Sequence, residues 1–171
     1  NERLTYGYDN SRRQAMPDAM ALPSTREQVV ALVRACRAHR IPVVARGRGT
    51  NTTGATVPTA GGVVVSFERM NRIVDIRAGD RCAVVEPGVL NGDLQRALKP
   101  HGLFWPAYPT SADYSTIGGN LACNAGGPRA VAMPAVAPGR PPIRRSTPAS
   151  TRNGSSTSRR RAPTASRRPI S

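Results

Sequence analysis

The sequence has few acidic, aromatic and histidine side chains. Its 171 residues include 10 acidic residues against 25 basic ones, aromatic residues make up 4%, and there are 2 histidines. The two histidines show no metal-ligand spacing, so we expect no metal. No apolar run approaches the roughly 20 residues of a membrane-spanning helix. The scarcity of acid leaves a formal net charge of +15, which is typical of proteins that bind nucleic acid.

The three cysteines are widely spaced and form no CxxC pair. We interpret Cys36, Cys82 and Cys123 as reduced, partly buried thiols of a cytosolic protein, because an odd number without such spacing does not indicate a disulfide framework. A cytoplasmic location is therefore expected, with peripheral attachment to a membrane as the alternative. Residue 1 is asparagine rather than methionine, which leaves open a targeting segment ahead of it.

The positive charge is concentrated at the C-terminal end. Residues 1–131 carry 16 basic and 10 acidic side chains, whereas residues 132–171 carry 9 arginines, 7 prolines and no acidic or aromatic residue. A segment of this composition cannot bury enough apolar surface to fold. We therefore predict a folded region over residues 1–131 and a disordered basic tail over residues 132–171. Our hypothesis for the tail is a reading-frame shift, because out-of-frame GC-rich codons give this composition.

Nucleic-acid binding through the tail is a competing hypothesis. Arg159–Arg161 and Arg167–Arg168 could neutralise phosphates without sequence preference. No aromatic side chain is interleaved with these arginines for base stacking, so we expect no specific nucleic-acid partner.

The first half of the folded region has the pattern of a helix, a strand and a glycine-rich loop. After an irregular segment over residues 1–20, Ser24 and Glu27 show the capping-box spacing of a helix start. Apolar residues follow at helical spacing and predict a helix end near His39. The run over residues 41–45 is predicted as a short buried strand.

The second half contains three more apolar runs and a second helix. The runs predict a β-meander over residues 63–67, 73–77 and 82–86. An amphipathic helix is predicted from Leu90 to His101, with Asn91 as its N-cap and Gly102 as its C-cap residue. An aromatic, proline-rich connector then leads to residue 109.

Two glycine-rich loops carry the functional signal. The first is Pro42–Gly54, an apolar strand that runs into glycines, small hydroxyl residues and one asparagine, and the second is Thr116–Gly127. Loops of this kind let a ligand approach the main chain closely, and their N–H groups suit phosphate oxygens. Together they could hold one extended dinucleotide. The spacing differs from the Rossmann fingerprint, because no third glycine opens a helix at the required offset.

Four blocks of sequence resemble the FAD-linked oxidases with a PCMH-type (vanillyl-alcohol-oxidase-like) FAD-binding domain. They are residues 42–51 (PVVARGRGTN), 62–73 (GVVVSFERMNRI), 85–89 (VEPGV) and 116–131 (TIGGNLACNAGGPRAV). The chain looks most similar to the branch of the glycolate oxidase FAD-binding subunit and D-lactate dehydrogenase. The resemblance implies an α+β fold in which residues 20–86 form a first subdomain and residues after about 108 begin a second.

The resemblance also implies a set of residues that bind FAD. The loop after the first strand would wrap the pyrophosphate, a Pro-Gly break would lie beside the flavin, and the second loop would line the cofactor. The residues are Arg46, Gly47, Arg48, Gly49, Thr50, Asn51, Pro87, Gly88, Pro109, Thr110, Ser111, Thr116, Gly118, Gly119, Asn120 and Asn124. For Arg46 and Arg48, a solvated surface charge is the alternative.

The implied function is the FAD-binding part of an oxidoreductase that oxidises a small 2-hydroxy acid. An alcohol or sugar oxidase, or a reductase of the same fold, is the alternative. We expect FAD to be non-covalent, since neither loop contains histidine and Cys123 is as easily a packing residue. The family's catalytic half has no counterpart here, so the catalytic residues are unknown and we expect weak FAD binding without activity. Partner subunits are a further expectation from the family.

Overall fold

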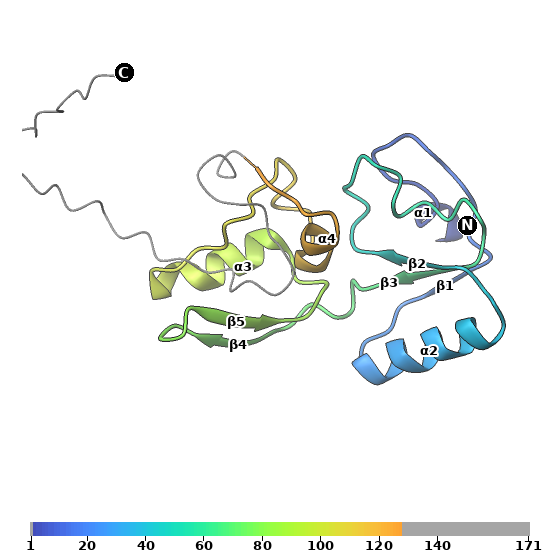
Figure 1. Cartoon of the computed structure of the whole chain (residues 1–171). Coiled ribbons are helices and arrows are strands. Elements are labelled where there is room, and N and C mark those ends of the chain that lie inside the picture. The colour runs from blue at the N-terminus through green and yellow to red at the C-terminus, as the bar shows by residue number, and fades with distance from the viewer. Residues whose placement is uncertain (1, 128–171) are drawn as a thin grey trace, which may run out of the picture.

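The computed structural model describes residues 2–127, and the expected disordered tail over residues 132–171 lies outside the described residues. Four of the five strands follow one another between α2 and α3, and Figure 1 shows the elements gathered around two separate sheets. The prediction of an α+β fold is confirmed.

A three-stranded parallel sheet forms the first part of the structure. Its strands are β1 (Ala19–Ala21), β3 (Val63–Ser66) and β2 (Val43–Arg46), in that order across the sheet. Helix α2 (Arg26–Ala38) connects β1 to β2 and lies along one face of the sheet (Figure 1). Val64 and Val65 of the central strand are buried. Because the strands are parallel, the loop after β2 leaves the sheet at the same end as the chain that follows β3.

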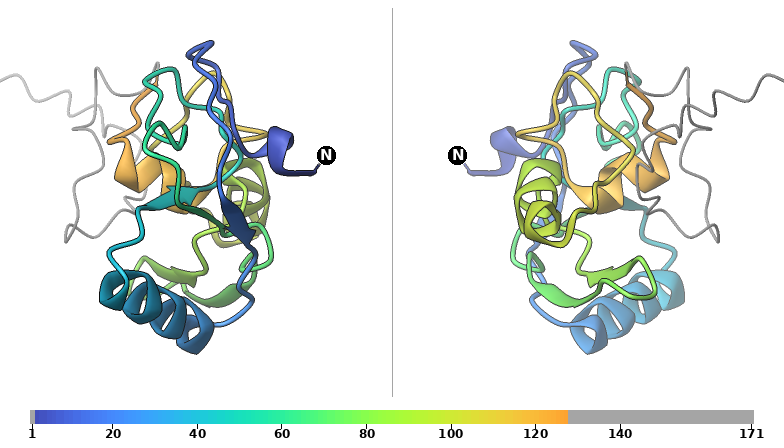
Figure 2. Two further views of the ribbon diagram at one scale, coloured as in Figure 1. Left: turned by 90° about the vertical axis from the view of Figure 1, so that its right-hand side faces the viewer. Right: turned by 90° about the vertical axis from the view of Figure 1, so that its left-hand side faces the viewer.

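An antiparallel hairpin and the following helix form the second part. The hairpin consists of β4 (Ile73–Arg77) and β5 (Cys82–Val85), and it is followed by α3 (Asn91–Leu98) and the 3-10 turn η1 (Lys99–His101). The inner side of the hairpin packs on a core made of Val89, Leu94, Leu98, Leu103, Trp105, Ala107 and Ile117. Two short helices, α1 (Glu2–Thr5) and α4 (Ile117–Ala122), complete the described elements. Figure 2 shows the same arrangement from two further sides.

Three expectations about the strands were wrong. Residues 63–67 do not begin a meander, because β3 pairs with β1 and β2 rather than with the hairpin. The segment over residues 1–20 is not wholly irregular, since it contains α1 and the start of β1. The strand near residues 41–45 is not buried along its length: Val43 is 40% exposed, because β2 is an edge strand.

The boundary between the two parts also differs from the expected one. The hairpin residues Ile73, Ile76, Ala83 and Val85 pack against the core that contains α3, and not against the parallel sheet. The division therefore comes before residue 73 rather than near residue 86.

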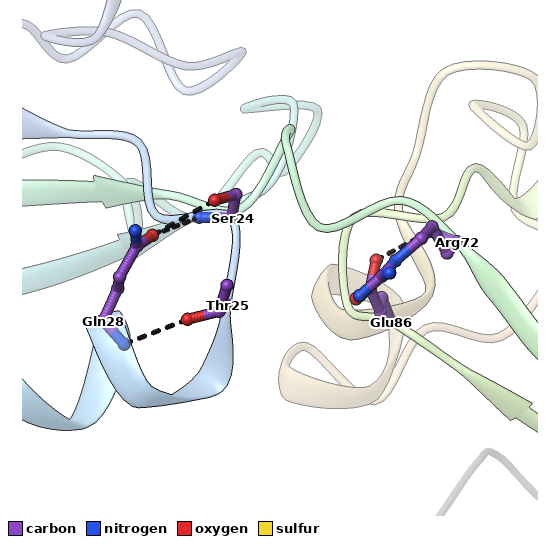
Figure 3. A network of polar contacts seen from close by, with 5 residues as sticks. All are labelled: Ser24, Thr25, Gln28, Arg72 and Glu86. Carbon is purple, nitrogen blue, oxygen red and sulfur yellow. Dashed lines mark hydrogen bonds and ion pairs between the residues drawn. The ribbon is translucent and has the colours of Figure 1, made fainter.

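The start of α2 is capped one residue later than predicted. Thr25 is the N-cap, and its hydroxyl accepts a hydrogen bond from the Gln28 main-chain N–H at 3.3 Å. The Gln28 side chain reaches back and accepts from the Ser24 main-chain N–H at 2.8 Å (Figure 3). The prediction that Ser24 and Glu27 form the box was therefore wrong, although the helix ends at His39 as expected.

Helix α3 begins without a side-chain cap. Leu90 is the N-cap residue, and Asn91 is fully buried within the helix, so the prediction of Asn91 as N-cap was wrong. Asn91 instead donates from Nδ2 to the Ala107 carbonyl at 2.7 Å. The first N–H groups of the helix find carbonyl partners in the connector, where Asn91 donates to Ser115 O and Gly92 to Ala112 O. Gly102 does end this helical segment, with a left-handed φ of 64°.

The open end of the hairpin is closed by an ion pair. Arg72 donates from Nη2 to Glu86 Oε1 at 2.7 Å, and its main-chain N–H donates to Oε2 at 2.8 Å (Figure 3). Glu86 in turn donates its main-chain N–H to Arg72 O at 3.0 Å. The paired Arg72 holds the pKa of the Glu86 carboxyl below its ordinary value.

Substitution of Thr25 tests the capping assignment. Thr25→Ala should lower the free energy of unfolding by about 1 kcal/mol, because an N–H of the first turn loses its partner. Ser24→Ala should cost much less, since the Ser24 main-chain bond to Gln28 survives the change. Urea denaturation of both variants measures the difference, and a larger loss for Ser24→Ala would overturn the assignment.

Candidate cofactor site

A cavity of about 320 Å³ lies where the loop after β2 meets the segment around α4. Both walls consist mainly of glycines and small polar residues. Its lining residues are Gly47, Arg48, Gly49, Thr50, Asn51, Thr52, Thr53, Thr56, Pro109, Thr110, Ser111, Ser115, Thr116, Gly119, Asn120, Cys123 and Ala125. The volume suits part of a ligand the size of a dinucleotide.

The two glycine-rich loops contact each other directly at Gly47 and Thr116. A Cβ atom added at Gly47 would overlap the Thr116 hydroxyl oxygen, so residue 47 has no room for a side chain. Thr116 holds its place as the N-cap of α4, where Oγ1 accepts from the Gly119 N–H at 3.2 Å. Two segments about seventy residues apart in the sequence therefore form one wall of the cavity.

Several polar groups around the cavity have no partner. Ser115 Oγ and Asn120 Nδ2 are buried without a hydrogen bond within the described residues, and both residues belong to the lining of the cavity. The main-chain N–H groups of residues 48–52, a partly exposed stretch of the loop, donate no hydrogen bond within residues 2–127. These N–H groups are available to a ligand rich in acceptor atoms, and the two buried side chains are exceptions to the rule that buried polar groups are paired.

Arg48 is the one charged side chain that lines the cavity within the described part of the chain. It is half exposed and lies 3.8 Å from the carboxylate of Glu68. Glu68 also accepts a hydrogen bond from the Tyr6 hydroxyl at 2.6 Å. Arg48 is thus loosely held at the rim, where its guanidinium can meet an anion.

Asn51 shapes the loop rather than simply facing the cavity. Its Oδ1 accepts from the main-chain N–H groups of Thr53 at 3.1 Å and Ala55 at 3.3 Å. Its Nδ2 donates to Thr56 Oγ1 at 3.1 Å. These bonds fold the chain back on itself after Thr50, which is the function of an Asx turn.

Most of the residues expected at the site line the cavity. They are Gly47, Arg48, Gly49, Thr50, Asn51, Pro109, Thr110, Ser111, Thr116, Gly119 and Asn120. The sequence reading missed Thr52, Thr53, Thr56, Ser115, Cys123 and Ala125. The run of hydroxyl residues after Gly49 was a signal for the first two, whereas nothing local marks Thr56.

Five expected residues do not line the cavity. Arg46 is buried and turned away from it: its guanidinium donates to Tyr8 O at 2.7 Å and to Thr5 O at 3.2 Å. Neither alternative considered for Arg46, a phosphate contact or a solvated charge, describes this arrangement. The other four residues outside the lining are Pro87, Gly88, Gly118 and Asn124.

Close packing explains why residues 88 and 118 are glycines, and Gly118 packs against Pro87. Gly118 donates its N–H to Pro87 O at 2.9 Å, and a Cβ at Gly118 would lie 2.7 Å from the Pro87 Cβ. Gly88 donates to Met70 O at 2.7 Å, and a Cβ there would overlap the Phe67 carbonyl. These residues seat α4 against the end of the hairpin. Asn124 is exposed, with a left-handed φ of 48° after α4.

Comparison with known proteins identifies the ligand class. A family model described as "FAD binding domain" matches residues 17–134. The chain belongs to this family of FAD-binding domains. The resemblance drawn from the four sequence blocks is therefore confirmed, and FAD is the cofactor of the family.

Relatives of this FAD-binding domain include several oxidoreductases. The glycolate oxidase subunit GlcD of Bacillus subtilis is 44% identical over 128 residues, 74% of this chain and 27% of the relative. D-2-hydroxyglutarate dehydrogenase of Stutzerimonas stutzeri is 42% identical over 71% of this chain and 26% of the relative. D-lactate dehydrogenase of Anaerostipes hadrus is 34% identical over 77% of this chain and 27% of the relative. The chain thus spans about a quarter of their length.

A solved structure shares the fold. Alkyldihydroxyacetonephosphate synthase superposes with a TM-score of 0.67 at 26% sequence identity, over 74% of this chain and 28% of that protein. Among residues 2–127, no helix has the length and apolar character that a membrane crossing needs, and no cluster of metal-binding side chains occurs.

The residues of the cavity fit FAD. The main-chain N–H groups of residues 48–52 and the rim guanidinium of Arg48 would supply donors for phosphate and ribityl oxygens. The close approach at Gly47 leaves the loop main chain uncovered by side chains, which a pyrophosphate requires. Among the described residues, the donor set is neutral apart from Arg48.

Substitution of Gly47 tests the contact between the loops. Gly47→Ala should weaken FAD binding at least tenfold, because its methyl group displaces Thr116 and with it the cavity wall. Gly79→Ala is a matched control, since a Cβ at Gly79 meets nothing within 4 Å. Flavin fluorescence titration measures both affinities, and unchanged binding by Gly47→Ala would refute the assignment of this wall.

The Asp9 carboxyl gives the stability a dependence on pH. Burial acts to raise its pKa, but hydrogen bonds from Ser11 and Thr56 outweigh burial and hold the pKa below the ordinary value of 3.8. The stabilisation should therefore be complete above that value and be lost as the pH falls through the lower pKa of the folded state. Thermal unfolding between pH 3 and 7 should show a weaker acid dependence in Asp9→Asn than in the unmodified chain.

Proposed function

We propose that this chain binds FAD non-covalently in the cavity between its two glycine-rich loops and provides the cofactor-binding part of an oxidoreductase for small 2-hydroxy acids. The named relatives include a glycolate oxidase subunit, a D-2-hydroxyglutarate dehydrogenase and a D-lactate dehydrogenase, and all three names contain such acids. Bound FAD would supply the acceptor for the hydride equivalent of the substrate's α-carbon.

The observation that carries the proposal is the direct contact between Gly47 and Thr116. It makes a single wall from two loops, and the loop after β2 brings main-chain N–H groups without a partner among the described residues to the same cavity. A site assembled from main-chain N–H groups of one loop and small side chains of the other suits an extended ligand with a central diphosphate. The loop after β2 would hold the pyrophosphate, and the segment around α4 would line the rest of the cofactor.

Non-covalent attachment is supported by the chemistry of the lining. Among residues 2–127, the lining contains no histidine or tyrosine, and Cys123 is its one thiol. Cys123 is exposed at the C-terminal end of α4, where its main-chain N–H caps the helix. Cys123 is therefore the one described lining residue at which a bond to the cofactor has to be tested.

Substrate binding and proton transfer are not assigned to any residue of this chain. The matched part makes up about a quarter of each relative's length, so the groups that hold the hydroxy acid in them need not lie in the matched part. GlcD is named as a subunit, and we propose that partner subunits complete the intact assembly in which this domain works. A cytoplasmic location, with peripheral membrane attachment as the alternative, stays a proposal from the sequence.

A flavin titration of the full 171-residue chain tests this function. FAD fluorescence should change saturably on titration with protein, but the cofactor should be lost on a desalting column because the site lacks the rest of a long relative's contacts. Acid precipitation should leave all flavin in the supernatant. Flavin that stays with the precipitate would refute non-covalent binding, and no saturable change at any concentration would refute the cofactor site.

A second measurement tests the absence of activity in the isolated chain. Anaerobic addition of glycolate, D-lactate or D-2-hydroxyglutarate should leave the absorbance of the protein–FAD mixture unchanged. Bleaching of the flavin by one of these acids would show that the chain carries its own catalytic groups.

A further inference from the structure

The N-terminal segment, residues 5–15, runs beside the cofactor loop, although it precedes the region that the family model matches. Asn10 donates its main-chain N–H to Asn51 O at 3.1 Å and its side-chain amide to Thr50 O at 3.4 Å. Two carbonyls of the loop are thus fixed by a segment about forty residues away in the sequence. The segment itself closes on a bond from the Ala15 N–H to Gly7 O at 2.9 Å.

Asp9 is the buried centre of this contact. Only 5% of its surface is exposed, and its Oδ2 accepts a hydrogen bond from the Thr56 hydroxyl at 3.2 Å. Because the Thr56 O–H donates to Asp9, the lone pairs of the Thr56 oxygen are free to accept hydrogen bonds from other donors. Asn51 Nδ2 is one of these donors, at 3.1 Å. Asn51 Oδ1 then holds the N–H groups of Thr53 and Ala55. A continuous chain of hydrogen bonds therefore joins Asp9 to the turn of the loop.

Arg46 supplies the opposite charge to Asp9. Its guanidinium lies within 3.4 Å of Thr56 Oγ1, donates to the carbonyls of Tyr8 and Thr5, and lies 5.7 Å from the centre of the Tyr6 ring. A Cβ added at Gly49 would overlap this guanidinium, so Arg46 supports the loop from behind. A buried cation needs a compensating anion, and the charge of Asp9 acts on Arg46 through space. Both side chains also form a hydrogen bond with the Thr56 hydroxyl.

We propose that Asp9 is a positioning residue for the FAD pyrophosphate loop. It does not line the cavity, so it acts through Thr56 and Arg46 on the main chain of residues 47–53. With Asp9 ionised, the Thr56 hydroxyl has one fixed orientation, Asn51 keeps its acceptor for Nδ2, and Arg46 stays beneath Gly49. The inference rests on the proposed function only for the identity of the ligand, since the loop geometry exists without it.

Asp9→Asn and Asp18→Asn form a matched pair for the test in the full chain. Each removes one carboxylate charge from the N-terminal region. Asp18 accepts from the Gly62 N–H at 2.6 Å, ahead of β3 and so at the opposite end of the parallel sheet from the cofactor loop. Asp18→Asn therefore reports what the loss of charge does to the fold in general.

The first readout is amide hydrogen exchange followed residue by residue by NMR, without FAD. Asp9→Asn should speed exchange at Thr53 and Ala55 roughly tenfold, because their acceptor on Asn51 loses its fixed position. In Asp9→Asn, exchange at Val64 and Val65 in the central strand should stay unchanged. In Asp18→Asn, exchange should stay unchanged at the two loop residues as well as at these two strand residues. Equal acceleration at the loop and at β3, or in both variants, would show a general loss of stability and overturn the proposal.

The second readout is FAD affinity by fluorescence titration, which Asp9→Asn should weaken about tenfold and Asp18→Asn should leave within twofold. If circular dichroism shows that Asp9→Asn is unfolded, Thr56→Val and Thr56→Ser replace it in the exchange measurement. Thr56→Val should show the faster exchange in the loop, and Thr56→Ser, which keeps the hydroxyl, should show the original exchange rates. Equal exchange rates in these two variants would overturn the proposal. If FAD fails to bind the unmodified chain, the proposed function fails while the exchange measurements still decide this inference.

Discussion

The absence of a side chain at residue 47 is the constraint on which the site depends. Because Gly47 lies directly against the Thr116 hydroxyl, the loop after β2 and the start of α4 share one wall. Thr116 can make that contact only while it caps α4, and α4 is held in turn by the contact of Gly118 with Pro87 at the end of the hairpin. The parallel sheet and the hairpin are thus joined through a short series of close main-chain contacts.

The described lining of the cavity offers more neutral donors than charged ones. The folded region carries many arginines, yet one of them lines the cavity among the described residues, and it is shared with Glu68. Arg46, next to the loop in sequence, is used to support the main chain instead. Neutral N–H donors attract an anionic ligand less strongly at a distance than cationic side chains do. Each N–H group, however, donates to a single oxygen in a defined direction, which favours specificity.

The sequence predicted the elements with strong local signals and missed those set by tertiary contacts. The glycine-rich loops, the two strands of the hairpin, and the C-terminal ends of α2 and of the helical segment that ends at Gly102 follow from spacing and turn residues that are visible in the chain. The pairing of β3 with β1 and β2 is decided by burial of Val64 and Val65, which no local pattern records. Likewise Asn91 has the chemistry of an N-cap, but a buried carbonyl at Ala107 takes its amide. Thr56 is at the site only because Asp9 lies beside it.

The contact between Gly47 and Thr116 also affects the order in which the chain folds. The main-chain bonds of α2 and the hairpin join residues that are close in the sequence, whereas the cavity needs segments about seventy residues apart, and its support reaches back to Asp9. Contacts that close large loops are slow to form, because their entropy cost comes before any gain. On refolding, the cavity should therefore be among the last features to form, because both glycine-rich loops must meet before a cofactor can be held.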